Sequence, residues 1–211
     1  YWLGAVLKKK FKSSLINPLL ISIVLTIPAL LLLHIDYPTY YEGAKYLNWL
    51  LTPATVALAV PLYEQFDLLK HNAAAVIAGI IAGVLSSLGT VLGLAVLFGF
   101  SHEEYITFLP KSITTAIGMG VSEELGGIVS ITAGVIIITG VLGNILAELV
   151  LKLFRITEPV AKGIALGTSA HAIGTAKAME LGEAEGAMSS LSIVVSGIIT
   201  VAGAAFFANF Y

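Results

Sequence analysis

The sequence predicts an all-α polytopic membrane protein with about six to eight transmembrane segments, two of which are broken or re-entrant helices in opposed orientation. Three observations predict this class: the scarcity of charge, five long windows without charge, and two short windows rich in Gly, Ser and Thr. Of the 211 residues, 57% are hydrophobic, whereas 11 are basic and 13 are acidic. Because a soluble domain carries about twice this charged fraction, the outside of the folded chain is expected to face lipid.

The composition also excludes several classes of function. A formal net charge of -2 provides no basic field for nucleic acid. The absence of cysteine excludes disulfides, thiolate metal sites and cysteine nucleophiles. No Walker motif, HExxH motif or nucleophile elbow occurs in the sequence. We therefore expect no enzyme activity, no catalytic residue, no metal, no cofactor and no nucleic-acid partner.

The five long windows contain no Asp, Glu, Lys or Arg, and each is long enough to cross or nearly cross a bilayer, which takes about 20 residues. Tyr1–Leu7 has the character of the end of an earlier, truncated span. In the third window, Gly79 and Gly83 have the small-xxx-small spacing of a helix-packing face. The windows are Asn17–Leu33, Tyr46–Tyr63, Asn72–His102, Leu125–Ala147 and Gly186–Tyr211.

The charged loops indicate the orientation. The positive-inside rule places the lysine cluster of residues 8–12 in the cytoplasm. The stretch Asp36–Asn48, with its four tyrosines, is then an outer interfacial loop. Beyond it, two topologies remain open. Lys152 and Arg155 lie outside if both short windows span the membrane, and inside if Tyr105–Glu124 enters and leaves at the outer face.

The two short windows, Ser112–Ser122 and Gly163–Ala176, are interrupted by glycine and closed by charged residues. A pair of short, interrupted apolar segments is the sequence sign of a transporter-type binding site near the membrane midplane. Inside a membrane, backbone leaves the helical hydrogen-bond ladder only where it lines a cavity or is buried in protein. The free N–H groups at the start of a half-helix attract a carboxylate or phosphate. The windows therefore predict a cavity that binds a small anion.

The candidate binding residues lie in and beside these windows. Lysines supply full charge, hydroxyls supply hydrogen-bond donors, and glycines permit the breaks. His171 is also the first candidate for proton coupling, because an unperturbed histidine has a pKa of about 6.5. Glu123 and Glu180 are the further proton-coupling candidates. The substrate-binding candidates are Lys111, Ser112, Thr114, Thr115, Gly118, Thr168, Ser169, His171, Gly174, Thr175 and Lys177.

Each candidate also has a structural alternative. Ser and Thr in apolar helices often bond back to a carbonyl one turn earlier, and small residues let membrane helices pack closely. A lone buried His171 is more often a hydrogen-bonded core residue, and Glu123 and Glu180 fit segment ends in water. Ionisable residues at membrane depth are costly and by default functional. Because Lys111, His171 and Lys177 all coincide with the two breaks, function is favoured for the group.

Four stretches are similar to one known family. They are Ala57–Tyr63, Leu109–Ala116, Glu124–Gly127 and Ala170–Ala178. With these residues the chain resembles the LrgB/CidB membrane protein family, especially its CidB-like members, and through it the plastidial glycolate/glycerate translocator. The similarity extends from about Asn17 to the C-terminus, and the run His-Ala-Ile-Gly-Thr-Ala-Lys-Ala is its most distinctive part.

The resemblance implies two alternative functions. One is transport of small monocarboxylates of the pyruvate, glycolate or glycerate class by alternating access, with or without a coupled proton. The other is a holin-like or antiholin-like protein that modulates murein hydrolase activity and cell lysis. Because a pore formed by helix association needs no opposed broken segments with basic residues, the sequence favours the carrier.

The resemblance further implies a multi-pass protein of a bacterial-type plasma membrane with a smaller LrgA/CidA-type membrane partner. The packing glycines favour a homodimer. One integral membrane domain is expected over residues 1–211, with mainly scaffold spans in 1–104 and the broken segments and core spans in 105–211. A small carboxylate anion is expected to bind between residues 111–118 and 167–177.

Overall fold

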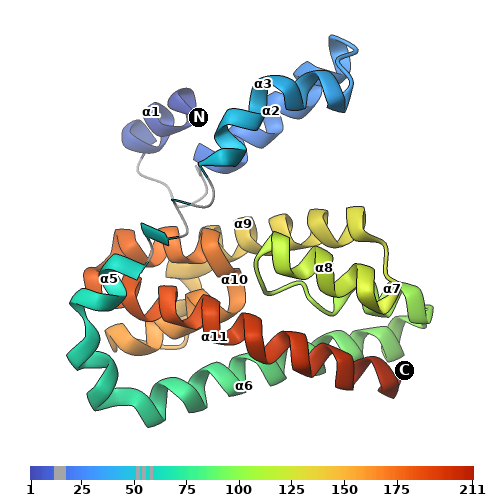
Figure 1. The fold of residues 1–211 in the computed structure, drawn as a ribbon. Helices are drawn as coiled ribbons and strands as arrows, with labels where there is room; N and C mark the ends of the chain where they lie inside the picture. The colour runs from blue at the N-terminus through green and yellow to red at the C-terminus, as the bar shows by residue number, and fades with distance from the viewer. Residues whose placement is uncertain (12–17, 51–52, 54–55, 58) are drawn as a thin grey trace. The chain divides into compact units, whose positions relative to one another are not determined.

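The computed structural model describes residues 1–211 except 12–17, 51–52, 54–55 and 58. All regular elements in the described residues are helical (Figure 1), which confirms the all-α prediction. The chain divides into two compact units, Tyr1–Leu58 and Ala59–Tyr211. The elements are α1 (Trp2–Phe11), α2 (Pro18–Leu32), α3 (Tyr37–Trp49), α5 (Ala59–Glu64), α6 (Phe66–Phe98), α7 (His102–Phe108), α8 (Thr115–Leu125), α9 (Val129–Leu153), α10 (Pro159–Leu181), α11 (Glu183–Phe207) and the short 3-10 helix η1 (Ala208–Phe210).

The first unit contains α1, α2 and α3. The prediction that Asp36–Asn48 forms a loop is wrong, because these residues belong almost entirely to the helix α3. Side-chain pairs about one turn apart stabilise this helix. The rings of Tyr37 and Tyr41 have centroids 5.9 Å apart, and Lys45 pairs with Glu42 at 2.5 Å. The polar composition of this stretch therefore reflects an exposed helix.

The predicted spans agree with the helices best in the second unit. There α6, α9 and α11 overlap the windows Asn72–His102, Leu125–Ala147 and Gly186–Tyr211. Among the described residues, these three helices are long and apolar enough to cross a membrane, and Leu20–Leu32 of α2 is a shorter apolar helix. The window Tyr46–Tyr63 begins in α3 and ends in α5, and part of it lies outside the described residues, as do the end of the lysine cluster and Asn17.

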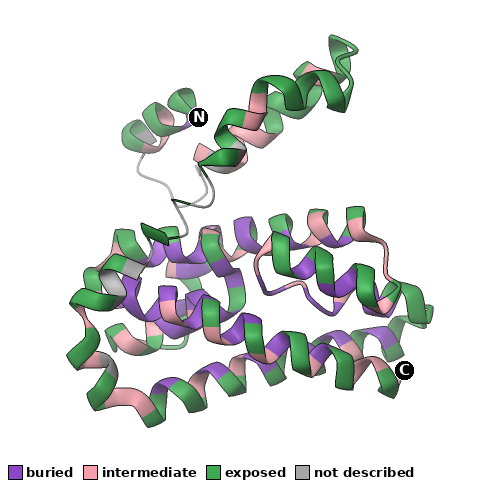
Figure 2. Cartoon of the chain, viewed as in Figure 1, coloured by how far each residue is buried: buried purple, intermediate pink, exposed green. Residues whose placement is uncertain are grey.

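A stripe along α6 forms the core of the second unit. Val76, Ile80 and Leu88 are at most 1% exposed and lie on one face, because they are spaced by about whole helical turns. On the opposite face Ile77 and Leu85 are 53% and 51% exposed. Figure 2 shows this division along α6, with buried residues on one side and exposed residues on the other. An exposed apolar face of this kind suits lipid rather than water.

Glycines bring α6 close to α10, as the small-xxx-small spacing predicts. A Cβ atom at Gly79 would contact the side chain of Ile164, and one at Gly83 would contact Thr168. These contacts set the distance between two helices that line the cavity described below. A Cβ atom added at Gly89, further along α6, would meet no neighbouring atom within 4 Å, so this glycine takes no part in the packing.

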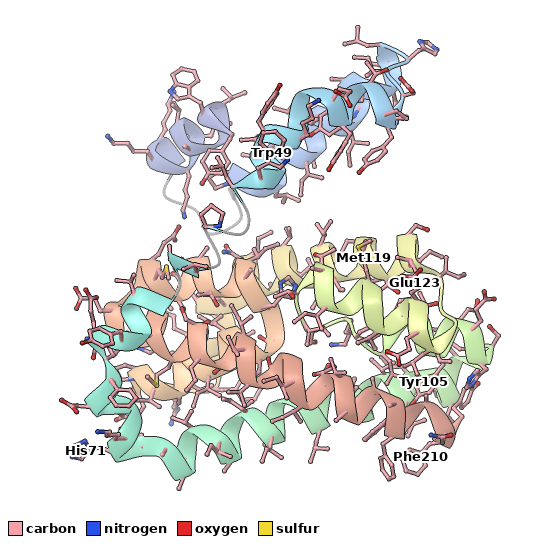
Figure 3. All side chains as sticks on the ribbon, in the orientation of Figure 1. Trp49, His71, Tyr105, Met119, Glu123 and Phe210 are labelled. Carbon is pink, nitrogen blue, oxygen red and sulfur yellow. The ribbon has the colours of Figure 1, made fainter. Side chains whose placement is uncertain are left out.

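The helix α7, which precedes the first short window, is capped at its N-terminus and bonded to α11. The Ser101 hydroxyl accepts the Glu104 N–H at 3.2 Å, and the Glu104 carboxylate accepts the Ser101 N–H at 2.7 Å. This backbone hydrogen bond, with that of the Ser101 hydroxyl, holds the pKa of Glu104 below its ordinary value. The fully buried Tyr105 (Figure 3) donates its hydroxyl to the Phe207 carbonyl at 2.9 Å. The helix α7 is therefore held against the end of α11.

Candidate functional site

The candidate site is a cavity of about 720 Å³ between α6, the α7–α8 loop and the first half of α10. Its volume lies within the range of ordinary small-molecule sites, about 300–1,000 Å³. It joins parts of both predicted windows, because Lys111 and Ser112 line it from the loop and Thr168 and Ser169 line it from α10. Its other polar lining residues are Asn72, Ser86, Ser87, Thr90 and Glu158.

The hydrogen bonds around Ser112 leave donors available to the cavity. The Ser87 hydroxyl donates to the Ser112 oxygen at 2.9 Å, and the Lys111 ammonium donates to the same oxygen at 2.9 Å. Because a hydroxyl oxygen accepts two hydrogen bonds, Ser112 has only its proton left to offer. Lys111 keeps further N–H donors and has no acceptor. This pair therefore suits an anion.

The hydroxyls on the helices around the cavity differ from Ser112, because their protons are already donated within the helix. Thr168, Ser169 and Thr90 each donate to the carbonyl one turn earlier, at 2.8, 2.6 and 2.6 Å. This back-bonding is the structural alternative for hydroxyls in apolar helices. Their oxygens can still accept a hydrogen bond from a ligand. Thr168 and Ser169 therefore have no hydroxyl proton left to donate to a ligand, in contrast to Lys111 and Ser112.

The second predicted window contains a break in the helix. His171 in α10 has φ 43° and ψ −134°, which is far from helical geometry. A non-glycine residue in such a region costs of order 1–3 kcal/mol and persists only where its surroundings enforce it. The two halves of α10 meet closely, because a Cβ atom at Gly174 would collide with the Leu166 carbonyl oxygen and the Ala170 side chain.

The first predicted window forms a loop followed by the 11-residue helix α8. At about 1.5 Å per residue, a helix of this length covers roughly half of a hydrocarbon core of about 30 Å. Thr114 is the residue before the helix and makes no side-chain capping bond, and Thr115 is its first residue. Gly118 is buried, with a Cβ atom there colliding with Ile136. These three residues do not line the cavity.

His171 is buried beside α9 and lies outside the cavity lining. Its side chain is 3% exposed, and its Nε2 lies 2.9 Å from the Ile136 carbonyl oxygen. Because a carbonyl can only accept, Nε2 carries the proton. Gly140 makes room for the ring, since a Cβ atom there would be 2.7 Å from the ring carbon Cε1. The ring therefore joins the break in α10 to the backbone of α9.

The remaining basic candidate, Lys177, lies in an ion cluster beyond the break. Its Nζ atom donates to Glu148 of α9 at 2.5 Å and to Glu180 at 3.3 Å. Gly174 and Thr175 are buried, and the Thr175 hydroxyl lies 2.7 Å from that of Ser189 on α11. None of these candidates lines the cavity. The proton-coupling candidate Glu123 is exposed on α8 (Figure 3).

Sequence reasoning missed the contribution of α6 to the cavity. Ser86, Ser87 and Thr90 lie on the same side of this helix as Gly79 and Gly83, at spacings of about one or two turns. The glycines indicated only a packing face. Hydroxyls that continue a small-residue face along an apolar helix are the signal that would have identified this wall.

Comparison with known proteins decides the family. The sequence matches the LrgB-like family over residues 1–210. The chain belongs to the LrgB-like family. Relatives of this LrgB-like protein include the antiholin-like proteins LrgB of Bacillus mycoides strain KBAB4 and Bacillus cereus strain B4264, each 39% identical over 95% of this chain and 88% of the relative. The uncharacterized protein YxaC of Bacillus subtilis strain 168 is 38% identical over 92% of this chain and 84% of its own. No solved structure matches the chain.

Family membership confirms the resemblance that the four sequence stretches predict. Together with the long apolar helices, it indicates a membrane protein. The names of the two LrgB relatives favour the holin-like alternative over the carrier that the sequence favours. The carrier and its site residues stay predictions for this LrgB-like protein.

Proposed function

We propose that this LrgB-like protein is an antiholin-like, multi-pass protein of a bacterial plasma membrane that modulates murein hydrolase activity and cell lysis. The observation that carries the proposal is 39% identity to antiholin-like relatives over 95% of the chain. The exposed apolar faces of the three long helices support its place in lipid. In this role the chain has no enzyme activity of its own and acts on hydrolases through the membrane.

The proposed membrane architecture has about six to eight segments. Three are the long helices α6, α9 and α11, and the others are shorter or broken. In this arrangement the α7–α8 segment and the broken helix α10 enter the membrane in opposed orientation. The proposed assembly is a homodimer that works with a smaller LrgA/CidA-type membrane protein.

Expression of the chain in a bacterium that lacks its own LrgB-like protein is expected to lower extracellular murein hydrolase activity and slow lysis. The reason is that an antiholin-like protein opposes the membrane event that releases or activates the hydrolases. Hydrolase activity is measured on murein-containing gels and lysis by the fall in culture turbidity. The control strain expresses an unrelated polytopic membrane protein at the same level. Equal hydrolase activity and equal lysis in the two strains would contradict the antiholin-like role.

The cavity favours a second candidate function, the carrier of small monocarboxylates. A carboxylate placed beside Lys111 and Ser112 accepts from the ammonium and from the free Ser112 proton. The hydroxyl of a 2-hydroxy acid donates to the acceptor oxygens of Thr168 or Ser169, which have spent their own protons. Glycolate and glycerate therefore fit this lining better than pyruvate, which has no hydroxyl donor.

Proteoliposomes that contain the purified chain are expected to accumulate radiolabelled glycolate faster than pyruvate while retaining a small fluorescent dye. The physical reason is that the cavity binds an anion without opening a continuous pore. Uptake is measured with and without a pH gradient, and empty liposomes provide the background. Dye leakage would identify a pore, and a tight liposome without carboxylate uptake would remove the carrier from consideration.

A further inference from the structure

A second cavity, of about 600 Å³, lies where α9 turns into α10. It belongs neither to the two predicted windows nor to the lining of the first cavity. Three basic side chains line it, those of Lys152, Arg155 and Lys162. Leu151, Ile156 and Leu181 provide an apolar wall. The cavity thus combines positive charge with hydrocarbon surface.

The positive charge of this cavity is only partly compensated. Glu148, the one acidic residue in the lining, is paired with Lys177 at 2.5 Å. Lys162 has an ion-pair partner on α11 at 3.5 Å. In the part of the chain that the structure describes, neither Lys152 nor Arg155 forms an ion pair within 4.0 Å, although Lys152 is close enough to Glu148 to interact with it electrostatically. The lining therefore has two cationic groups available for an anion.

Arg155, which follows the end of α9, has a backbone conformation that is unfavourable for any residue except glycine. The Ile156 N–H donates to the Leu151 carbonyl at 2.9 Å, and the Arg155 N–H donates to the Lys152 carbonyl at 3.1 Å. This pair of bonds is a Schellman motif, in which the left-handed position normally holds glycine. Here Arg155 occupies it with φ 54°. An arginine at a position that favours glycine is consistent with a role for its guanidinium group.

The cavity also lies at the end of a helix that is long and apolar enough to cross a membrane. The apolar span Val129–Leu153 ends directly beside it. Leu149, Leu153 and Phe154 are 63%, 72% and 69% exposed, which suits contact with acyl chains. Cations just beyond the end of an apolar span meet the phosphates of the bilayer surface.

We propose that this cavity binds the phosphate group of an anionic phospholipid. Lys152 and Arg155 bind the phosphate, and the exposed apolar residues at the end of α9 contact the acyl chains of the same lipid. Charge complementarity and the adjoining apolar surface together favour a lipid over free phosphate, because free phosphate would use the cations alone. The site is independent of the antiholin-like and carrier functions.

The test compares the full chain with the double variant Lys152→Gln/Arg155→Gln in phosphatidylcholine vesicles that contain spin-labelled phosphatidylglycerol. Each cation near an anionic lipid surface contributes about a fivefold affinity, so the double variant is expected to bind the label about 30-fold more weakly. The control Lys45→Gln/Lys70→Gln removes the same charge elsewhere and keeps wild-type affinity. Equal affinity in the two double variants, no preference over spin-labelled phosphatidylcholine, or full displacement by inorganic phosphate would each overturn the proposal.

Arg155→Gly separates lipid binding from folding. Glycine relieves the positive φ at this position, so the melting temperature of the purified chain is expected to rise. At the same time, affinity for phosphatidylglycerol is expected to fall about fivefold, because the guanidinium group is lost. A variant that is more stable and keeps the full preference for phosphatidylglycerol would assign Arg155 no part in the site.

Discussion

Gly167→Ala is expected to lower the free energy of unfolding by about 3 kcal/mol, because the added methyl group has no space between α10 and α11. A Cβ atom at Gly167 would lie 2.5 Å from the Ser189 carbonyl oxygen and 2.7 Å from the Ser192 Cβ atom. The closest obstacle is backbone, so a side-chain rotation cannot relieve the clash, and α11 must shift. The change is measured as the melting temperature of the purified chain in detergent.

Gly89→Ala is the matched control for this prediction. Gly89 also lies inside a long helix, but no atom lies within 4 Å of the added carbon. Alanine has a helix propensity about 1 kcal/mol better than that of glycine, so this variant is expected to be as stable as the wild type or more stable. Similar melting temperatures for the two variants would show that the α10–α11 contact does not limit stability.

Lys111→Met is expected to reduce glycolate uptake in proteoliposomes by about 10- to 100-fold at low substrate concentration, if the chain is a carrier. The lysine is the one cationic group that lines the first cavity among its described lining residues. A hydrogen bond from a charged donor to a carboxylate in such a site contributes about 1.5–3 kcal/mol. Methionine keeps a similar chain length and removes only the charge and its donors. Initial rates are compared at equal amounts of reconstituted protein.

Lys70→Met is the control for Lys111. Lys70 is an exposed cation on α6 that lies over the Phe66 ring, with Nζ 4.7 Å from the ring centroid, and it does not line the cavity. Its replacement is expected to leave the uptake rate unchanged. Equal losses in both variants would point to a general effect of charge on reconstitution. Full uptake by Lys111→Met would remove this lysine from the binding site.

The long helices could be predicted from sequence because a membrane span is defined by composition over many residues. The uncharged windows located α6, α9 and α11 for this reason. The break in α10 was also predictable, since glycines and hydroxyls cluster on either side of His171. The helix α3 was missed because its polar composition is that of a loop, whereas short-range pairs such as Tyr37 with Tyr41 stabilise it as a helix.

The cavity could be predicted only in part, because its lining depends on which faces meet. Lys111 and Ser112 belong to the predicted set and line it, whereas Thr175 and Lys177 belong to the same set and bond elsewhere. Composition identifies a polar residue in an apolar segment but not its partner. Whether a hydroxyl proton is already used, as at Thr168, depends on helix geometry at that residue. The hydroxyls of α6 could have been recognised as a continuation of its glycine face, but the sequence does not say that this face lies against α10.

The hydrogen bonds at Ser112 affect how well the cavity could bind an amino acid in place of an organic acid. Alanine matches the carbon skeleton of pyruvate, but it carries an ammonium group beside its carboxylate. Next to Lys111 that second charge meets like charge, and the Ser112 oxygen, which already accepts from Ser87 and Lys111, offers it no acceptor. In a carrier this pair would therefore favour a simple carboxylate over a zwitterion, and acceptance of an amino acid of equal size would depend on the other acceptors of the lining, the Glu158 carboxylate and the Thr168 and Ser169 oxygens.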